Sequence, residues 1–408
     1  MVLTRRSFLD ICGKSAIAAA SSPLWLDSSL LHAQHREKSA PFLAVFFLRG
    51  GADGLHLVPP TGDRLYASSR QHLALRETLP FATGFGLHPE LAPLQDLVER
   101  DELAVVHACG SPEINRSHFE AQDHVEAGEL GPLRLRSGWL ARGLGGAGTT
   151  SPFALMALAA QLPMTLHGSG SFAIGEPDEF GLPTASPAAR RALAADYAAQ
   201  TDPALSRAGT RALDALDEVE KRLGKLPLGN HRSRAKGRRQ RHKRGGQLAQ
   251  KVDNLLRLEA SGLPVRAVFL ESNSWDTHQN QGAESGSMAN SIRDLSTALA
   301  NLANGLRGKR EWTALVHTEF GRTVRPNGSR GSDHGHGSLA LLAGSRVRGG
   351  LHGDWPGLAE SKLTEGRDLA VTTDYRSVAW EVLRAHLGEP PPPTTFPGFE
   401  PSSLSLFA

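Results

Sequence analysis

The chain has 408 residues, of which 40% are hydrophobic, so it is long enough to bury a large core. Cys12 and Cys109 are its only cysteines, which excludes a small domain held together by several disulfides. The net charge of +3 depends on residues 230–246, which hold eight Lys or Arg and no acid. Without that stretch the chain is net acidic, which excludes a fold that is basic over its whole surface.

The N-terminus has the features of an export signal. Arg5 and Arg6 precede an apolar run from Ile11 to about Leu31, which Gly, Lys, Ser, Pro and Asp residues interrupt. The run is too polar to span a membrane. We therefore predict a twin-arginine signal peptide over residues 1–33, with the Tat machinery as a partner and a periplasmic or extracellular location. The alternative is a basic N-terminal helix that stays on the protein, and cleavage of the leader is left open.

Short apolar segments alternate with helical patterns along the rest of the chain. The segments have no strict alternation, as in strands buried on both faces of a mostly parallel sheet. We predict strands at Phe42–Leu48, Leu103–His107, Val265–Glu271, Thr313–Thr318 and Leu339–Ala343. Apolar spacing predicts helices around Leu91–Leu97, over Met288–Leu306 and over Tyr375–Leu387. This order predicts a doubly wound α/β domain over residues 34–408, with helices on both faces of the sheet.

Residues 175–262 depart from this alternation and predict a helical insertion. An apolar stripe from Leu205 to Leu223 and a second helix from about Gln247 to Ala260 flank the basic loop 230–246. That loop lacks aromatic residues, so we interpret it as a solvated loop and expect no specific nucleic-acid binding. A proline-rich tail begins at residue 390. No later segment is apolar enough to span a membrane.

Ligands of open α/β sheets bind beyond the carboxyl ends of the strands, and polar residues gather at those places in this chain. Asp53 follows the first strand in a glycine-rich turn, where it would bind a cation or accept from turn amides. Ser117 and Glu120 have the spacing of a capping box, which predicts that a helix begins at Ser117. A hydroxyl at a helix N-terminus can also act on an anion, so Ser117 is a candidate nucleophile or substrate contact.

Metal-ligand residue types follow the third and fourth strands. Asp276 and His278 lie two residues apart, which places them on the same side of an extended segment; the alternative is a simple Asp–His hydrogen bond. Asp333, His334 and His336 lie between glycines. Carboxylate and imidazole groups suit zinc, iron or manganese.

Together with Asp53, these residues would form a site for two divalent ions, which can stabilise both the attacking and the leaving oxygen of a displacement. Glu319 and Arg322 also follow the fourth strand. We expect these two residues to orient the ligands or to hold an anion. His352 is a further candidate ligand, with a surface loop as its alternative role.

Six motifs occur in order between Phe42 and Leu387, and together they resemble the Tat-exported family called domain of unknown function 1501. They are F-L-R-G-G-A-D-G-L, R-S-H-F-E-A, W-D-T-H-x-N, T-E-F-G-R, S-D-H-G and T-D-Y-R-S-V. The family is grouped with the alkaline phosphatase and sulfatase superfamily. The resemblance implies a phosphatase-like α/β fold with two metals.

The resemblance also implies roles for single residues. Asp53, Asp333 and His334 resemble one metal site, with Ser117 at the position of the nucleophile. Asp276 and His278 resemble the other metal site, for which His336 or His352 would supply the last histidine.

The sequence therefore predicts an exported metal-dependent hydrolase that acts on a small anionic substrate, a phosphate or sulfate ester. Its cofactors would be divalent metal ions, one or two per chain. The sequence does not distinguish zinc, manganese, iron and calcium. The alternative is a non-catalytic exported binding or assembly protein that keeps the fold and one metal.

Overall fold

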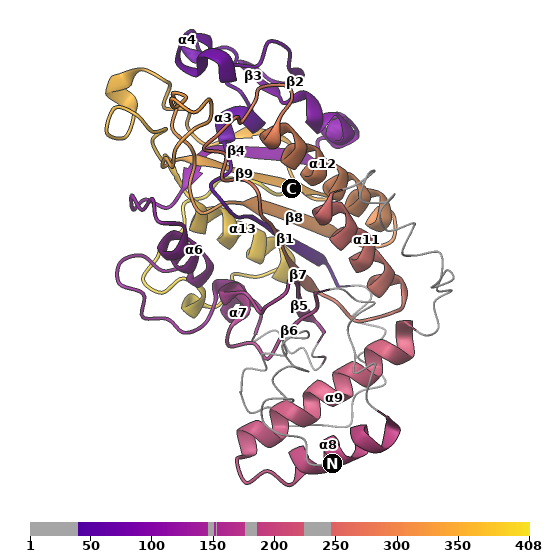
Figure 1. Cartoon of the computed structure of the whole chain (residues 1–408). Coiled ribbons are helices and arrows are strands. Elements are labelled where there is room, and N and C mark those ends of the chain that lie inside the picture. The colour runs from indigo at the N-terminus through magenta and orange to yellow at the C-terminus, as the bar shows by residue number, and fades with distance from the viewer. Residues whose placement is uncertain (1–39, 146–150, 152, 176–185, 224–245) are drawn as a thin grey trace.

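A computed structural model describes residues 40–145, 151, 153–175, 186–223 and 246–408 (Figure 1). The predicted signal peptide and nearly all of the predicted basic loop lie outside these residues. Among the described residues, no helix combines the length and apolar character that crossing a bilayer requires.

The described chain forms a mixed α/β structure around a sheet of nine strands. The strand order is β10-β4-β9-β8-β1-β7-β5-β6, and β11 also pairs with β4. All pairings in this sheet are parallel except those of β9 with β4 and β8. The strands are β1 (Phe42–Leu48), β4 (Leu103–Gly110), β5 (Leu155–Leu158), β6 (Phe172–Ala173), β7 (Ala267–Ser272), β8 (Trp312–His317), β9 (Ser338–Gly344), β10 (Gly350–His352) and β11 (Thr373–Asp374).

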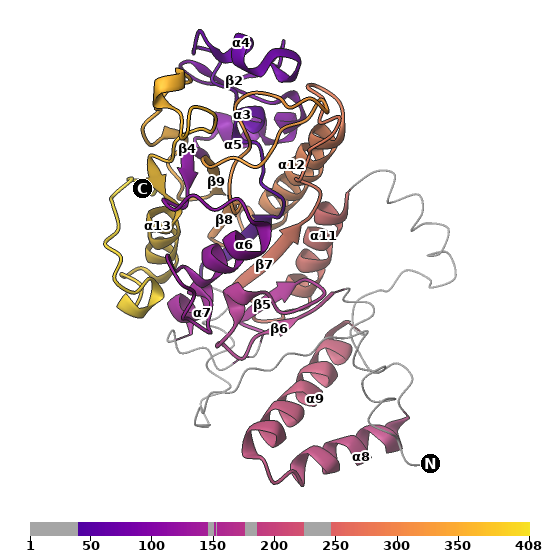
Figure 2. The ribbon, with the colours of Figure 1, turned by 60° about the vertical axis from the view of Figure 1, so that its left-hand side comes forward.

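Strand β1 shows why helices cover both faces of this sheet. All seven of its residues are buried, and successive side chains of a strand point to opposite faces. Phe42, Ala44 and Phe46 belong to one apolar core with the helices α11 (Gln247–Ala260) and α12 (Ser287–Leu306). Leu43, Val45 and Phe47 belong to a second core with α7 (Trp139–Leu144) and α13 (Tyr375–Leu387). The predicted mostly parallel sheet with two helical layers is confirmed (Figure 2).

The remaining elements lie around this framework. The described residues include α3 (Gly54–Leu57), α4 (Tyr66–Arg70), α5 (Gln95–Glu99), α6 (His118–Ala127) and a hairpin of β2 (Leu79–Ala82) and β3 (Phe85–Leu87). Helices α8 (Pro187–Ala198) and α9 (Pro203–Leu223) pack on each other beyond the β5–β6 edge of the sheet (Figures 1 and 2). Helix α11 packs against α12 and β7 and so belongs to the layer over the sheet. The extent of the helical insertion stays a prediction.

The direction of β9 brings the loop that precedes it to the edge of the sheet where β1 and β8 end. Strands β1 and β8 are parallel, so their carboxyl ends lie at the same edge. Strand β9 runs antiparallel to β8, with Val316 paired to Leu341 and Thr313 to Gly344. The segment that enters β9 therefore lies at the edge where β1 and β8 end, which brings residues 331–337 to the predicted site.

Candidate metal centre

Four side chains meet at the carboxyl edge of the sheet. His118 begins α6, Asp276 and His278 follow β7, and His334 precedes β9. One ligand atom each of His118, Asp276 and His334 lies within 4.8 Å of the other two. His278 joins them, because its Nε2 lies 2.9 Å from Nε2 of His334 and 3.0 Å from Oδ1 of Asp276. These four residues are called the His–Asp cluster below.

The three imidazoles of the cluster are oriented in the same way. The Nδ1 atom of each ring lies 2.8 Å from an oxygen that can only accept a hydrogen bond. The acceptors are the Glu319 carboxylate for His118, the Asp333 carboxylate for His278 and the backbone carbonyl of Arg116 for His334. These contacts fit neutral rings that are protonated at Nδ1, in which the Nε2 lone pairs face the cluster. Metal-ligating histidines are held in this manner.

The centre of the cluster fits a cation. Two Nε2 lone pairs face each other at 2.9 Å between His278 and His334, a distance at which they repel unless a cation or a proton lies between them. Nε2 of His118 is buried and has no hydrogen-bond partner among the described residues; Asp276 Oδ2 lies 3.5 Å away. A buried polar atom without a partner is costly, and a bound metal ion would remove that cost at His118 and the repulsion between His278 and His334.

Asp276 is kept ionised and in place by Arg322. Nη1 of the buried Arg322 donates to Asp276 Oδ1 at 2.8 Å, and the same Nη1 donates to the Gly50 carbonyl at 3.3 Å. Burial by itself raises the pKa of Asp276, but the hydrogen bond and charge of Arg322 outweigh it and the pKa lies below the usual value. Arg322 thus holds the carboxylate of Asp276, a candidate ligand, in place.

Glu319 supports the cluster from the opposite side through His118. Its buried carboxylate accepts from His118 Nδ1, from the Gly50 amide at 2.8 Å and from Gln122 Nε2 at 2.9 Å. Burial raises the pKa of Glu319, but these hydrogen bonds lower it by more, and the net pKa lies below the usual value. The carboxyl group is therefore ionised. The hydrogen bond to Glu319 in turn raises the pKa of His118. Glu319 therefore orients His118, a candidate ligand, and makes it more basic.

Two predicted ligands lie outside the cluster. Asp53 is buried beside Arg70 and accepts from Gln281 Nε2 at 2.7 Å. Burial raises its pKa, and the charge of Arg70 more than offsets this, so Asp53 is an anion paired with a cation of the protein itself. His336 uses both ring nitrogens, with Thr364 Oγ1 at 3.1 Å and the Ser111 carbonyl at 2.9 Å.

The remaining predicted residues support or border the cluster. Asp333 accepts from His278 and from Asn327 Nδ2 at 2.8 Å, and the hydrogen bond from Asn327 is the main cause of its lowered pKa. The Asp333 carboxylate therefore holds His278, a candidate ligand, in place. His352 ends strand β10, outside the cluster, and its Nε2 lies 2.9 Å from the Arg348 carbonyl.

Ser117 begins α6, as the sequence predicts, but the capping box is absent. Its side chain is exposed and makes no capping hydrogen bond. Asn115 replaces the expected pairing, since its Oδ1 accepts from the Ser117 amide at 2.9 Å and its Nδ2 donates to Glu120 at 3.3 Å. The start of α6, next to His118, therefore has no side-chain cap.

His118 is the ligand candidate that sequence reasoning missed. The spacing of Ser117 and Glu120 predicts a helix start at this segment, which needs no metal-ligand role for His118. The available signal was its residue type in a loop after a predicted strand, which is the pattern that identified Asp276 and His334.

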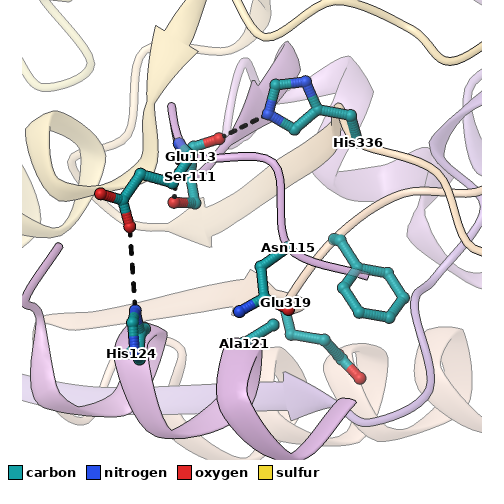
Figure 3. Close-up of a pocket in the computed structure, with 8 residues that line it drawn as sticks. Ser111, Glu113, Asn115, Ala121, His124, Glu319 and His336 are labelled. Atoms are coloured by element: carbon teal, nitrogen blue, oxygen red, sulfur yellow. Dashed lines mark hydrogen bonds and ion pairs between the residues drawn. The ribbon is translucent and has the colours of Figure 1, made fainter. Parts of the chain in front are cut away.

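A small pocket adjoins the cluster on the side of α6. Its lining comprises Ser111, Glu113, Asn115, Ala121, His124, Glu319, Phe320 and His336. Figure 3 shows the ion pair of His124 with Glu113, at 3.9 Å, across this hollow. The ring of Phe320 stacks on that of His118, with centroids 4.8 Å apart. Two residues of this lining, Glu319 and Phe320, therefore contact His118 of the cluster.

A family model described as a protein of unknown function, DUF1501, matches residues 194–383. This match supports the family resemblance over that range, which holds four of the six motifs and includes Asp276, His278 and His334. No curated protein shows a significant match to the chain.

Proposed function

We propose that this protein is an exported hydrolase with a single divalent metal ion, held by His118, Asp276, His278 and His334, that acts on a phosphate or sulfate ester. The observation that carries the proposal is the common orientation of three imidazoles, each with Nδ1 bound to an acceptor and Nε2 turned to one point. Imidazole and carboxylate donors favour zinc, iron or manganese over calcium.

A bound ion of this kind polarises an ester oxygen and lowers the pKa of a water molecule. The protein's own residues supply orientation and an anion-binding surface. The N-terminus of the ten-residue helix α6 has no side-chain cap, and helix N-termini attract anions. The exposed Ser117 hydroxyl lies at this helix start, between the Arg116 carbonyl that holds His334 and the ligand His118. Ser117 is therefore the proposed nucleophile or substrate contact.

The proposal includes export of the folded protein by the Tat route, because Arg5 and Arg6 precede a weakly apolar run. Folding in the cytoplasm would let the cluster load its metal before periplasmic ions compete for the ligands. We also propose an alkaline phosphatase-like fold, which the mostly parallel sheet with two helical layers supports.

One observation favours the non-catalytic alternative. Asp53, which the family resemblance assigns to a metal, is paired with Arg70. This pairing leaves one cluster of ligands where hydrolysis by two metals would need two. A binding or assembly protein that uses one metal would need no more than this cluster.

The test is to purify the protein, measure bound metals by elemental mass spectrometry, and assay aryl phosphates, phosphodiesters and sulfates. His334→Ala and Asp276→Ala remove ligands, and His352→Ala is the control for loss of a histidine outside the cluster. We expect about one metal per chain in the wild type and in His352→Ala, with metal and hydrolysis lost in the other two. Bound metal without hydrolysis would favour the non-catalytic alternative. Absence of bound metal would refute both forms of the proposal.

A further inference from the structure

Gln281 connects the two loops that carry most of the metal ligands. Its side chain is fully buried, and its Oε1 accepts from Thr277 Oγ1 at 3.0 Å and from Ser332 Oγ at 2.5 Å. Its Nε2 donates to Asp53 Oδ2 at 2.7 Å. The Asp53 carboxylate can only accept a hydrogen bond, so the amide nitrogen must face Asp53 and the amide oxygen must face the two hydroxyls.

The two hydroxyls belong to the ligand loops themselves. Thr277 lies between Asp276 and His278, and Ser332 directly precedes Asp333 and His334. The two loops also share a backbone hydrogen bond, from the Ser332 amide to the Thr277 carbonyl at 3.2 Å. One amide oxygen therefore holds both loops at a fixed separation, and that separation sets the distance between His278 and His334.

We propose that Gln281 is a positioning residue of the metal centre, which fixes the spacing of the two ligand loops through Thr277 and Ser332. This inference rests on the proposed function, because it takes the His–Asp cluster as a metal site. It gives Asp53 a different role from the predicted one: Asp53 anchors the amide of Gln281. Arg70 fixes Asp53 in turn, since its Nη1 also donates to the carbonyls of Thr323 and Val324, at 3.2 and 3.1 Å.

A continuous set of buried contacts follows from these hydrogen bonds. The Oγ of Ser332 accepts from Arg322 Nε at 3.3 Å, and Arg322 holds Asp276. In order, the members are Arg70, Asp53, Gln281, Ser332, Arg322 and Asp276. The first five are buried, so solvent does not compete for their hydrogen bonds.

The experiment removes one hydroxyl at a time and compares three readouts. Thr277→Val and Ser332→Ala each delete one hydrogen bond to Gln281, and Ser332→Ala also deletes the hydrogen bond from Arg322 Nε, so Thr277→Val is the cleaner of the two. Gln281→Met deletes both bonds to the hydroxyls together with the bond to Asp53. Ser296→Ala is the matched control, because this buried serine of α12 donates to the Glu90 carbonyl at 2.7 Å, outside the network. The readouts are the melting temperature, the affinity for Co²⁺ from its visible absorption, and hydrogen exchange of the Ser332 amide in metal-free protein.

We expect Co²⁺ affinity to fall about 10- to 100-fold in each single variant and to stay at the wild-type value in Ser296→Ala. Both hydroxyls act through the same oxygen of Gln281, so their effects should not be independent. The fold-loss of Co²⁺ affinity in Thr277→Val/Ser332→Ala should therefore be smaller than the product of the two single fold-losses. Wild-type affinity in both single variants, or fully multiplicative losses, would overturn the proposal. The two single variants decide the question even if Gln281→Met does not fold.

Failure of the proposed metal centre is recognised separately. If the wild type binds no Co²⁺, the metal proposal is refuted, and the exchange rate of the Ser332 amide tests the spacing of the loops. Faster exchange in Thr277→Val and Ser332→Ala than in Ser296→Ala would support the positioning role of Gln281. Equal rates would overturn it.

Discussion

The substitution Glu319→Gln isolates the charge that supports His118. The amide has the shape of the carboxylate, and its oxygen can still accept from His118, Gln122 and the Gly50 amide. The amide nitrogen would face Thr318 Oγ1, which lies 2.9 Å from the carboxylate and also donates to the Leu48 carbonyl at 2.7 Å. Every hydrogen bond of the group can therefore persist, and the negative charge is what is lost.

The expected result is a weaker metal site in a fold that stays intact. Loss of an outer carboxylate behind a metal-binding histidine costs about 10- to 100-fold in metal affinity, which corresponds to about 1.4 to 2.7 kcal/mol. Competition of Glu319→Gln with a chromogenic zinc chelator measures this loss. We also expect the pKa of His118 to fall toward its ordinary value, because the hydrogen bond to Glu319 is the main cause of its rise. Histidine NMR of the metal-free protein measures that change.

Glu126→Gln is the matched control for this prediction. Glu126 is also buried and also belongs to α6, but it pairs with Arg49 at 2.7 Å and accepts from the amide and hydroxyl of Thr165 at 3.0 Å. Its variant should bind metal as the wild type does. If Glu319→Gln retains full affinity, or if both variants lose affinity equally, the orientation of His118 by Glu319 has no specific effect on the metal and the reasoning is refuted.

Three further predictions concern the same molecule. Asp333→Asn should weaken metal binding less than Glu319→Gln, because the Asp333 side chain is 50% exposed and solvent screens its charge; the same chelator competition would contradict this if its loss were larger. His386→Leu should raise the free energy of unfolding by about 1 to 3 kcal/mol, because both ring nitrogens of the buried His386 lack partners among the described residues; urea unfolding that shows a loss would disprove this. Burial lowers the pKa of His107 from 6.5 to about 4, so as the pH falls the unfolded chain takes up a proton before the folded chain does. The stability that the neutral, buried His107 contributes is therefore complete above about pH 6.5 and falls by about 3 kcal/mol toward pH 4. Urea unfolding that shows no such fall would count against this prediction.

The sequence predicted the long elements well because their patterns are local. The limits of Phe42–Leu48 and Tyr375–Leu387 agree with the structure, since a run of seven apolar residues and a helical repeat before Gly388 each define their own ends. Strands β6, β10 and β11 have two or three residues. Such segments are too short to carry a pattern, and they become strands only by pairing with neighbours that are distant in sequence.

The residue types and loop positions of the candidate site could be predicted from the sequence. The residues that each candidate contacts in the folded chain could not. Asp276, His278 and His334 were found because ligand-type residues lie beside the sheet edge. The antiparallel direction of β9, which brings His334 there, is not visible in the sequence. Asp53 has the residue type and the position of a ligand as well. It lies outside the cluster and pairs with Arg70, which only tertiary packing brings to it.

The charges around the His–Asp cluster argue for one divalent ion. Asp276, Asp333 and Glu319 all have lowered pKa values and are ionised at neutral pH, while Arg322 supplies one positive charge. With neutral imidazoles, the centre then has two unbalanced negative charges, which a single divalent cation neutralises. Oδ2 of Asp53 is paired with Arg70 and only its Oδ1 has no partner among the described residues, so a second cation there would lie beside a guanidinium that already balances the charge. Charge balance and ligand geometry therefore both predict one metal equivalent per chain.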